Sequence, residues 1–250
     1  EAEKVLKQVI KLQPELIESL NNLGSILTCM EKYEEAKAIL NRSIKIQPSN
    51  AEALSNLGDV YRKLNEYEQA IDQYKGAIQI NPNYYEAYNN MGLALTELEK
   101  YSEAKNILKQ AIKINPDFAE AYNSLGLFYE KINKYEQAID QYKGAIQINP
   151  KYYEALNNMG LALTELKKYE EAENILKQAI KIDPKQVQAY NNLGTIYNAV
   201  KHFHKAIKYY RMALNTNKNV AGVHHNLGYA LSLIGDNKNS IYHQKLAVDL

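Results

Sequence analysis

The chain has 250 residues, with 30 basic and 29 acidic side chains, so no net charge steers it toward nucleic acid or an anionic membrane. Its single cysteine, Cys29, excludes a disulfide framework and favours a reducing, cytoplasmic compartment. No apolar run reaches the roughly 20 residues that span a bilayer, and the charged first residues do not resemble a signal peptide. We expect an intracellular protein without membrane insertion. Because the chain begins in mid-pattern, we also expect it to be a piece of something longer.

Three residue series recur with a period of 34 residues. Such self-similarity predicts a solenoid, in which each unit buries its apolar face against its neighbours. The series are Pro14, Pro48, Pro82, Pro116, Pro150 and Pro184; Gly24, Gly58, Gly92, Gly126, Gly160, Gly194 and Gly228; and Ala36, Ala70, Ala104, Ala138, Ala172 and Ala206.

In chain order, we expect a single solenoid domain over 1–250 that opens with the second helix of a preceding unit at 1–16. The full units that follow are 17–50, 51–84, 85–118, 119–152, 153–186 and 187–220, and a divergent partial unit covers 221–250. In that last unit His224 stands where Leu or Tyr is usual, Asn237 replaces an aromatic residue, and Ser240 replaces the alanine.

The third unit shows the pattern inside each repeat. Its apolar residues have helical spacing, which predicts two amphipathic helices, roughly at 85–98 and 102–115, joined by a turn near Glu99–Tyr101. The Asn115–Pro116 pair should end the second helix, because proline disfavours a helical residue before it and lacks an amide hydrogen. Gly92 costs about 1 kcal/mol in mid-helix relative to Ala, so we expect it to let the two helices approach closely.

The residues Ala87-Tyr88-Asn89-Asn90-Met91-Gly92, with Leu95, Tyr101, Ala104, Leu108, Ala111 and Pro116 after them, resemble the tetratricopeptide repeat. This resemblance covers essentially the whole chain. It implies an all-α, right-handed solenoid of antiparallel helix pairs whose first helices line a concave groove, where known members bind peptides. In the similar arm of O-linked N-acetylglucosamine transferases, an asparagine ladder holds extended peptides. Related 35-residue repeats read RNA, but the strict 34-residue period disfavours that function here.

The units also alternate in pairs. Residues 66–100 match 134–168 at 31 of 35 positions. Duplication of a two-unit segment explains this identity, and an alternation of bulky and slim interfaces is compatible with it. At one position of the second helices, tyrosines alternate with leucines along the chain: Leu40, Tyr74, Leu108, Tyr142, Leu176 and Tyr210.

Two rows of polar residues, mostly asparagine, follow the first helices. A carboxamide offers hydrogen-bond donors and an acceptor, so these residues could bind a peptide backbone. The alternative is that each asparagine has only a local structural role, which was copied when the repeats were duplicated. The Asn22 row is Asn22, Asn56, Asn90, Ser124, Asn158, Asn192 and Asn226. The Asn21 row is Asn21, Ser55, Asn89, Asn123, Asn157, Asn191 and His225.

Two further rows sharpen the predicted groove. Successive first helices begin with glutamates, namely Glu18, Glu52, Glu86, Glu120 and Glu154. Negative charge at this end suits the helix dipole. In the groove these glutamates, above all Glu86, Glu120 and Glu154, would favour basic side chains on a partner. Leu93, Leu127 and Leu161 would offer an apolar strip, at a position where other units carry Ser25, Asp59 and Thr195. Basic residues on the second helices, such as Lys109, fit a solvated outer face.

No catalytic chemistry is predicted. The chain has no phosphate-binding glycine motif, no HxxxH pair, and no Lys and Arg at the positions where some tetratricopeptide domains clamp a terminal carboxylate. We therefore predict a protein–protein interaction scaffold without cofactor or metal, working within a larger complex. The alternatives are the substrate-recruiting arm of an enzyme whose catalytic domain lies outside this chain, and an architectural subunit of a large assembly.

Overall fold

A computed structural model describes residues 2–250, and every regular element in that range is an α-helix. The chain divides into two compact units, 1–131 and 132–250, and each is described by itself. Unit 1 contains α1 (Ala2–Leu12), α2 (Ile17–Cys29), α3 (Tyr33–Ile46), α4 (Ala51–Lys63), α5 (Tyr67–Ile80), α6 (Tyr85–Glu97), α7 (Tyr101–Ile114) and α8 (Ala119–Lys131). Unit 2 contains α9 (Tyr135–Ile148), α10 (Tyr153–Glu165), α11 (Tyr169–Ile182), α12 (Val187–Ala199), α13 (Phe203–Thr216), α14 (Ala221–Leu233) and α15 (Asn237–Asp249).

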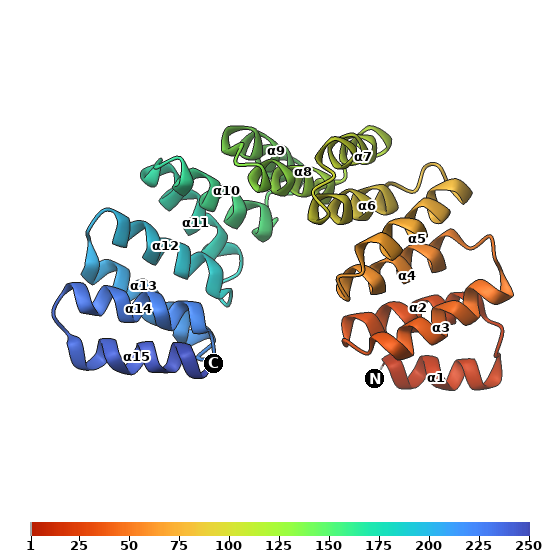
Figure 1. The fold of residues 1–250 in the computed structure, drawn as a ribbon, viewed down its shortest axis with the longest axis horizontal. Coiled ribbons are helices and arrows are strands. Elements are labelled where there is room, and N and C mark those ends of the chain that lie inside the picture. Colours follow the sequence, from red (N-terminus) through yellow and green to blue (C-terminus); the bar gives the residue numbers. More distant parts are fainter. Residues whose placement is uncertain (1) are drawn as a thin grey trace. The chain divides into compact units, whose positions relative to one another are not determined.

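Within each unit every helix packs against the helices before and after it in the sequence (Figure 1). The two helices predicted for the third repeat are confirmed as α6 and α7, with ends within one residue of the prediction. The turn aromatic Tyr101 is the first residue of α7 instead of part of the turn. As expected, α7 stops at Ile114, before Asn115 and Pro116, and Asn115 has an extended backbone. The all-α repeat architecture is therefore confirmed.

The mid-helix glycines allow the close approach that the sequence predicted. A Cβ atom on Gly92 would lie 2.5 Å from Leu108 Cγ, and one on Gly58 would lie 2.6 Å from Tyr74 Cε1. Both partners come from the second helix of the same pair and are fully buried. A leucine or tyrosine side chain of the second helix thus occupies the space of the missing side chain at Gly24, Gly58, Gly92, Gly160 and Gly194.

The turn between the two helices of a pair holds one residue in the left-handed conformation. Six of these residues are not glycine, which strains the backbone because the side chain crowds the following carbonyl. The last pair, α14–α15, has Gly235 there (φ 81°) and avoids the strain. The six are Glu31, Asn65, Glu99, Asn133, Lys167 and Lys201, with φ between 57° and 61°.

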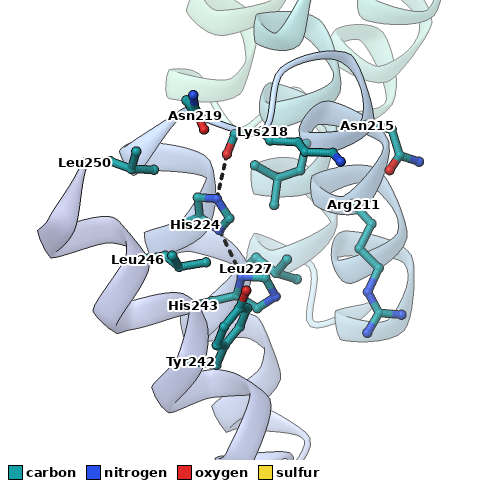
Figure 2. Close-up of a pocket in the computed structure, with 11 residues that line it drawn as sticks. Arg211, Asn215, Lys218, Asn219, His224, Leu227, Tyr242, His243, Leu246 and Leu250 are labelled. Atoms are coloured by element: carbon teal, nitrogen blue, oxygen red, sulfur yellow. Dashed lines mark hydrogen bonds between the residues drawn. The ribbon is translucent and has the colours of Figure 1, made fainter.

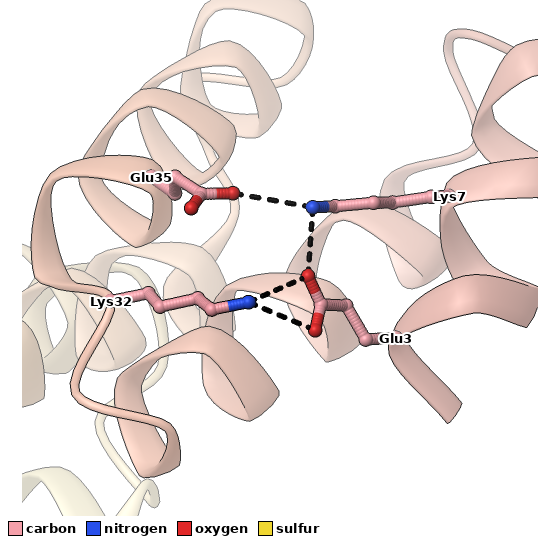
Figure 3. A network of polar contacts seen from close by, with 4 residues as sticks. All are labelled: Glu3, Lys7, Lys32 and Glu35. Atoms are coloured by element: carbon pink, nitrogen blue, oxygen red, sulfur yellow. Dashed lines mark hydrogen bonds and ion pairs between the residues drawn. The ribbon is translucent and has the colours of Figure 1, made fainter. Parts of the chain in front are cut away.

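Helix α1 is attached to the next pair by charged residues. Glu3 accepts hydrogen bonds from Lys7 at 2.7 Å and from Lys32 at 3.0 Å, and Lys7 also reaches Glu35 at 3.2 Å (Figure 3). The hydrogen bonds from Lys7 and Lys32 lower the pKa of the Glu3 carboxyl. Since these groups lie at the surface, they orient α1 more than they stabilise it.

Candidate functional site

The predicted groove residues lie on the first helices, α2, α4, α6 and α8 in unit 1 and α10, α12 and α14 in unit 2. In unit 1 consecutive first helices contact each other, and the same holds in unit 2. The rows defined from the sequence therefore run as continuous stripes within each unit. Their accessibility differs from row to row.

In unit 1 the Asn21 row is buried. Asn21 is 1% exposed, Ser55 3%, Asn89 4% and Asn123 7%. Asn21 shows what such a residue does: its carbonyl oxygen accepts from Ser43 Oγ at 2.7 Å, and its amide donates to Glu52 Oε2 at 3.0 Å. This amide links α2 to α3 and α4, so its hydrogen bonds serve the packing of the repeats.

In unit 2 the two rows are bonded to each other across repeats. The Asn192 amide donates to Asn157 Oδ1 at 3.0 Å, and the Asn226 amide donates to Asn191 Oδ1 at 3.0 Å. Each bond joins first helices of neighbouring repeats. Because a carboxamide has two N–H groups and a carbonyl oxygen, a partly exposed donor such as Asn192 keeps capacity for another partner.

On α2, α4 and α6 the Asn22 row is more accessible than the Asn21 row. Asn22 is exposed, and Asn56 and Asn90 are partly buried, whereas Ser124 on α8 is 4% exposed. Asn158 in unit 2 is partly buried as well. The structure therefore separates the two neighbouring rows on α2, α4 and α6, whereas in unit 2 Asn157 and Asn191 of the Asn21 row are partly exposed as well.

The apolar strip is accessible in the middle of the chain. Leu127 is 37% exposed, and Leu93 and Leu161 are partly exposed. Among the acidic residues, Glu120 and Glu154 are exposed and Glu86 is partly buried. An apolar side chain and a carboxylate are thus available on α8 in unit 1, and again on α10 in unit 2.

Two polar residues at the strip position, Asp59 and Thr195, contact a buried tyrosine of the second helix, a link that sequence analysis missed. The Tyr74 hydroxyl donates to Asp59 Oδ1 at 2.7 Å, and the Tyr210 hydroxyl reaches Thr195 Oγ1 at 3.4 Å. Both tyrosines fill the space beside a glycine, and the hydroxyl emerges on the face of the first helix. A tyrosine 15 residues after a polar residue was the signal that could have revealed this link.

Asp59 is the centre of a polar cluster in unit 1. Besides Tyr74, the Asn90 amide donates to Asp59 at 2.9 Å, and Arg62 lies at 3.7 Å. Burial raises the pKa of the Asp59 carboxyl, although the hydrogen bonds from Tyr74 and Asn90 and the charge of Arg62 oppose the shift. The cluster borders a small cavity of about 120 Å³ beside Ser25.

The described residues hold no group of three or more His, Cys, Asp or Glu side chains that could bind a metal ion. Of the five histidines, His224 and His243 contact each other, at 2.9 Å between their Nδ1 atoms. Within residues 2–250, no helix is both long and apolar enough to cross a membrane.

Several solved structures share this fold. The Cut9–Hcn1 hetero-tetramer of the APC/C aligns over 92% of this chain with 20% identity and a TM-score of 0.79. A tetratricopeptide repeat protein from Parabacteroides merdae aligns over 92% of this chain and 91% of its own, with 19% identity and a TM-score of 0.71. YrrB, described as a tetratricopeptide repeat protein with an unusual peptide-binding site, aligns over 74% of this chain and 96% of its own, with 22% identity and a TM-score of 0.54.

These similarities, with the period and the helix pairs, define a tetratricopeptide repeat protein. Residues 16–227 match the family described as Cilia and flagella-associated protein 70 C-terminal domain, and the chain belongs to that family. The chain spans 46% of the Cut9–Hcn1 chain it matches. No curated protein sequence matches it significantly. The fold is that of protein-interaction scaffolds, a class that generally lacks catalytic activity.

Proposed function

We propose that this protein is an interaction scaffold that holds an extended or helical segment of a partner against its first helices. The observation that carries the proposal is Leu127, a large apolar side chain that is 37% exposed on α8, with Leu93 in the same stripe of unit 1. A contiguous apolar patch rimmed by polar residues is typical of a surface that binds other proteins, and in this proposal Leu127 and Leu93 form such a patch.

The Asn22 row supplies the polar part of the proposed contact. Asn22 and Asn56 in unit 1, and Asn158 and Asn192 in unit 2, are exposed or partly exposed. A peptide backbone has N–H and C=O groups to satisfy, and a carboxamide can pair with either. The proposed asparagine grip rests on this row, because Asn89 and Asn123 of the Asn21 row are buried.

In this proposal, the exposed carboxylates make the groove favour partner segments with basic side chains. Glu120 and Glu154 start α8 and α10 and are exposed, so a lysine or arginine beside an apolar anchor of the partner would gain an attractive interaction. Surface charges of this kind act mostly on the association rate and on specificity. We therefore expect the selected partners to carry a basic residue close to an aliphatic or aromatic one.

The test is selection of peptides from a random 12-residue phage-displayed library, followed by calorimetry on the enriched peptides. We expect Leu127→Asp to weaken their binding about tenfold or more, since it places a charge at the apolar contact. Asn106→Asp, which adds the same charge on an exposed position of α7, is the matched control and should bind normally. Equal binding by Leu127→Asp and the unaltered chain would overturn the proposal.

A further inference from the structure

A second pocket lies away from the proposed groove, between the second helices α13 and α15 of unit 2 (Figure 2). Its volume is about 480 Å³, which is within the range of ligand-binding pockets. Apolar walls come from Leu214 on α13 and Leu246 on α15, and polar groups come from Arg211, Lys218 and His224. Nothing in the proposed function of the groove uses this pocket.

The pocket lies in the last repeat, which departs from the pattern. In the preceding repeats a leucine or tyrosine fills the position of His224, and isoleucine, glutamine or tyrosine fills the position of His243. Gln244 of α15 is exposed, whereas the leucine or tyrosine at its position elsewhere is buried. The residues in place of His224 are Leu20, Leu54, Tyr88, Tyr122, Leu156 and Tyr190. Of the polar side chains that replace the usual residues, His224 and His243 line the pocket.

The two histidines have a defined arrangement. His224, which is 6% exposed, has its Nε2 atom 2.8 Å from the carbonyl oxygen of Lys218, so Nε2 carries the hydrogen and donates it. In the neutral ring Nδ1 of His224 is then an acceptor, and it receives the hydrogen bond from Nδ1 of His243 at 2.9 Å. Nε2 of His243 is left outside this pair. A proton added there preserves both hydrogen bonds, because neither Nδ1 has to change its role.

The charge around the pair is positive. Arg211 and Lys218 both line the pocket, and none of its lining residues is acidic. Burial, together with the charges of His224 and Arg211, lowers the pKa of His243. The charge of Arg211 also lowers the pKa of Asp236, a carboxylate that does not line the pocket. Inside the pocket a bound anion would face Arg211, Lys218 and His243, and the leucines would cover an adjacent aliphatic group.

We propose that this pocket binds an acidic peptide segment, with a glutamate or aspartate carboxylate at Arg211 and His243 and a neighbouring aliphatic side chain between Leu214 and Leu246. Charge complementarity selects the carboxylate, and the apolar walls select a peptide over a bare anion. Guanidinium and imidazolium groups both form charge-assisted hydrogen bonds to carboxylates. The site is separate from the asparagine rows. It binds an acidic segment, whereas the groove is proposed to favour a basic one.

The test is a titration of the whole chain, labelled with ¹³C at the histidine rings, with the blocked dipeptide acetyl-Leu-Glu-amide followed by NMR. We expect shifts in the His243 and His224 ring signals and a raised pKa of His243, while the exposed His202, His204 and His225 stay unchanged. Acetyl-Leu-Gln-amide, which lacks the charge, should produce neither change. Equal shifts from the glutamine dipeptide, or from sodium acetate at the same concentration, would overturn the proposal.

The variant Arg211→Gln should weaken binding of the glutamate dipeptide about tenfold, because it removes a hydrogen bond to a charged group. Arg211 is exposed, so the substitution should leave the fold intact, which circular dichroism would verify. Lys208→Gln, an exposed position of α13 outside the pocket, removes the same charge and serves as the control. If both variants weaken binding equally, the effect is general electrostatics and the proposed site is wrong. These outcomes are independent of the phage selection on the groove.

Discussion

The helix pairs α4–α5 and α6–α7 are neighbours in unit 1 and have equal lengths, but they fill the same buried space differently. In α4–α5 a tyrosine lies beside the glycine, and in α6–α7 a leucine does. The Tyr74 hydroxyl of α5 donates to Asp59 on the first helix, whereas Leu93 stands at the same position of the pair with the leucine. This match holds for these two pairs and is not a rule for the chain, because Leu127 precedes Tyr142, and Ser25 precedes Leu40, by the same 15 residues.

The largest expected effect comes from filling the space beside the glycine. Gly58→Ala should destabilise the chain by about 2 kcal/mol, since overpacking costs about 3 kcal/mol and helix propensity returns about 1. Gly92→Ala should cost less, because Leu108 can change its rotamer and the Tyr74 ring is rigid and held by Asp59. Urea unfolding followed by circular dichroism measures both.

Gly76→Ala is the control for these variants. A Cβ at this position of α5 meets only Leu54 Cδ1, at 3.3 Å, so the gain in helix propensity should dominate. We expect no loss, or a gain of up to about 1 kcal/mol. If Gly58→Ala and Gly76→Ala change the unfolding free energy equally, the close approach of α4 and α5 does not limit stability, and the proposed difference between the pairs is wrong.

The second effect comes from removing the hydroxyl group of Tyr74. Tyr74→Phe should cost about 1.5 kcal/mol, because Asp59 loses a hydrogen bond to a charged group. Tyr210→Phe, whose hydroxyl contacts the neutral Thr195 at 3.4 Å, should cost about 1 kcal/mol or less. In an Asp59→Leu background, Tyr74→Phe should cost close to nothing. A double-mutant cycle measures this coupling, and additive effects would show that the pair is not coupled.

The third prediction concerns how the unfolding free energy depends on pH through the Asp59 carboxyl of α4. Burial raises the pKa of Asp59 in the folded chain above its ordinary value of 3.8, so the native state binds more protons than the unfolded state in this window. Stability from this group is therefore present at low pH and falls as the pH rises from about 3.8 through the raised pKa. The difference in unfolding free energy between the unaltered chain and Asp59→Asn should decrease over that window. A difference that grows with pH would contradict the direction of the shift.

The smallest effect lies in the turns of the two pairs. Glu99, between α6 and α7, has a left-handed backbone with φ of 58°, so Glu99→Gly should stabilise the chain by about 0.5–1 kcal/mol. Asn65, between α4 and α5, tolerates this conformation better, and its side chain accepts a hydrogen bond from Tyr67 at 2.8 Å. Asn65→Gly should therefore give no gain. Thermal unfolding compares the two variants, and equal gains would mean that the asparagine confers no advantage.

Much of the fold could be predicted from the sequence because the signals repeat. The prolines indicate where the second helices end, and the glycines indicate where the two helices of a pair approach closely. Because each signal recurs along the chain, an exception in one unit does not hide the pattern. The left-handed turn residues could not be predicted in this way. Positions 31 and 99 carry glutamate, a residue type that does not point to a left-handed backbone, whereas the asparagine at position 65 is compatible with one.

The candidate site was less predictable. Asn89 and Asn90 are adjacent and chemically identical, yet Asn89 is buried and Asn90 is partly exposed. Each residue turns the side chain by about 100° around a helix, so the exposure depends on how the neighbouring helix packs. His224 and His243 were visible in the sequence only as departures from the repeat. Their spacing of 19 residues follows no ligand motif, and their contact depends on how α15 packs against α14.

By itself the sequence determined the helical pair, its length and its recurrence, because these follow from local rules for proline, glycine and apolar spacing. It also determined which residue types recur along the first helices. Only the tertiary structure decided which of them face solvent, which bond to the next repeat, and where a pocket opens. The physical reason is that burial and hydrogen bonding belong to pairs of helices, whereas a periodic pattern describes one helix at a time.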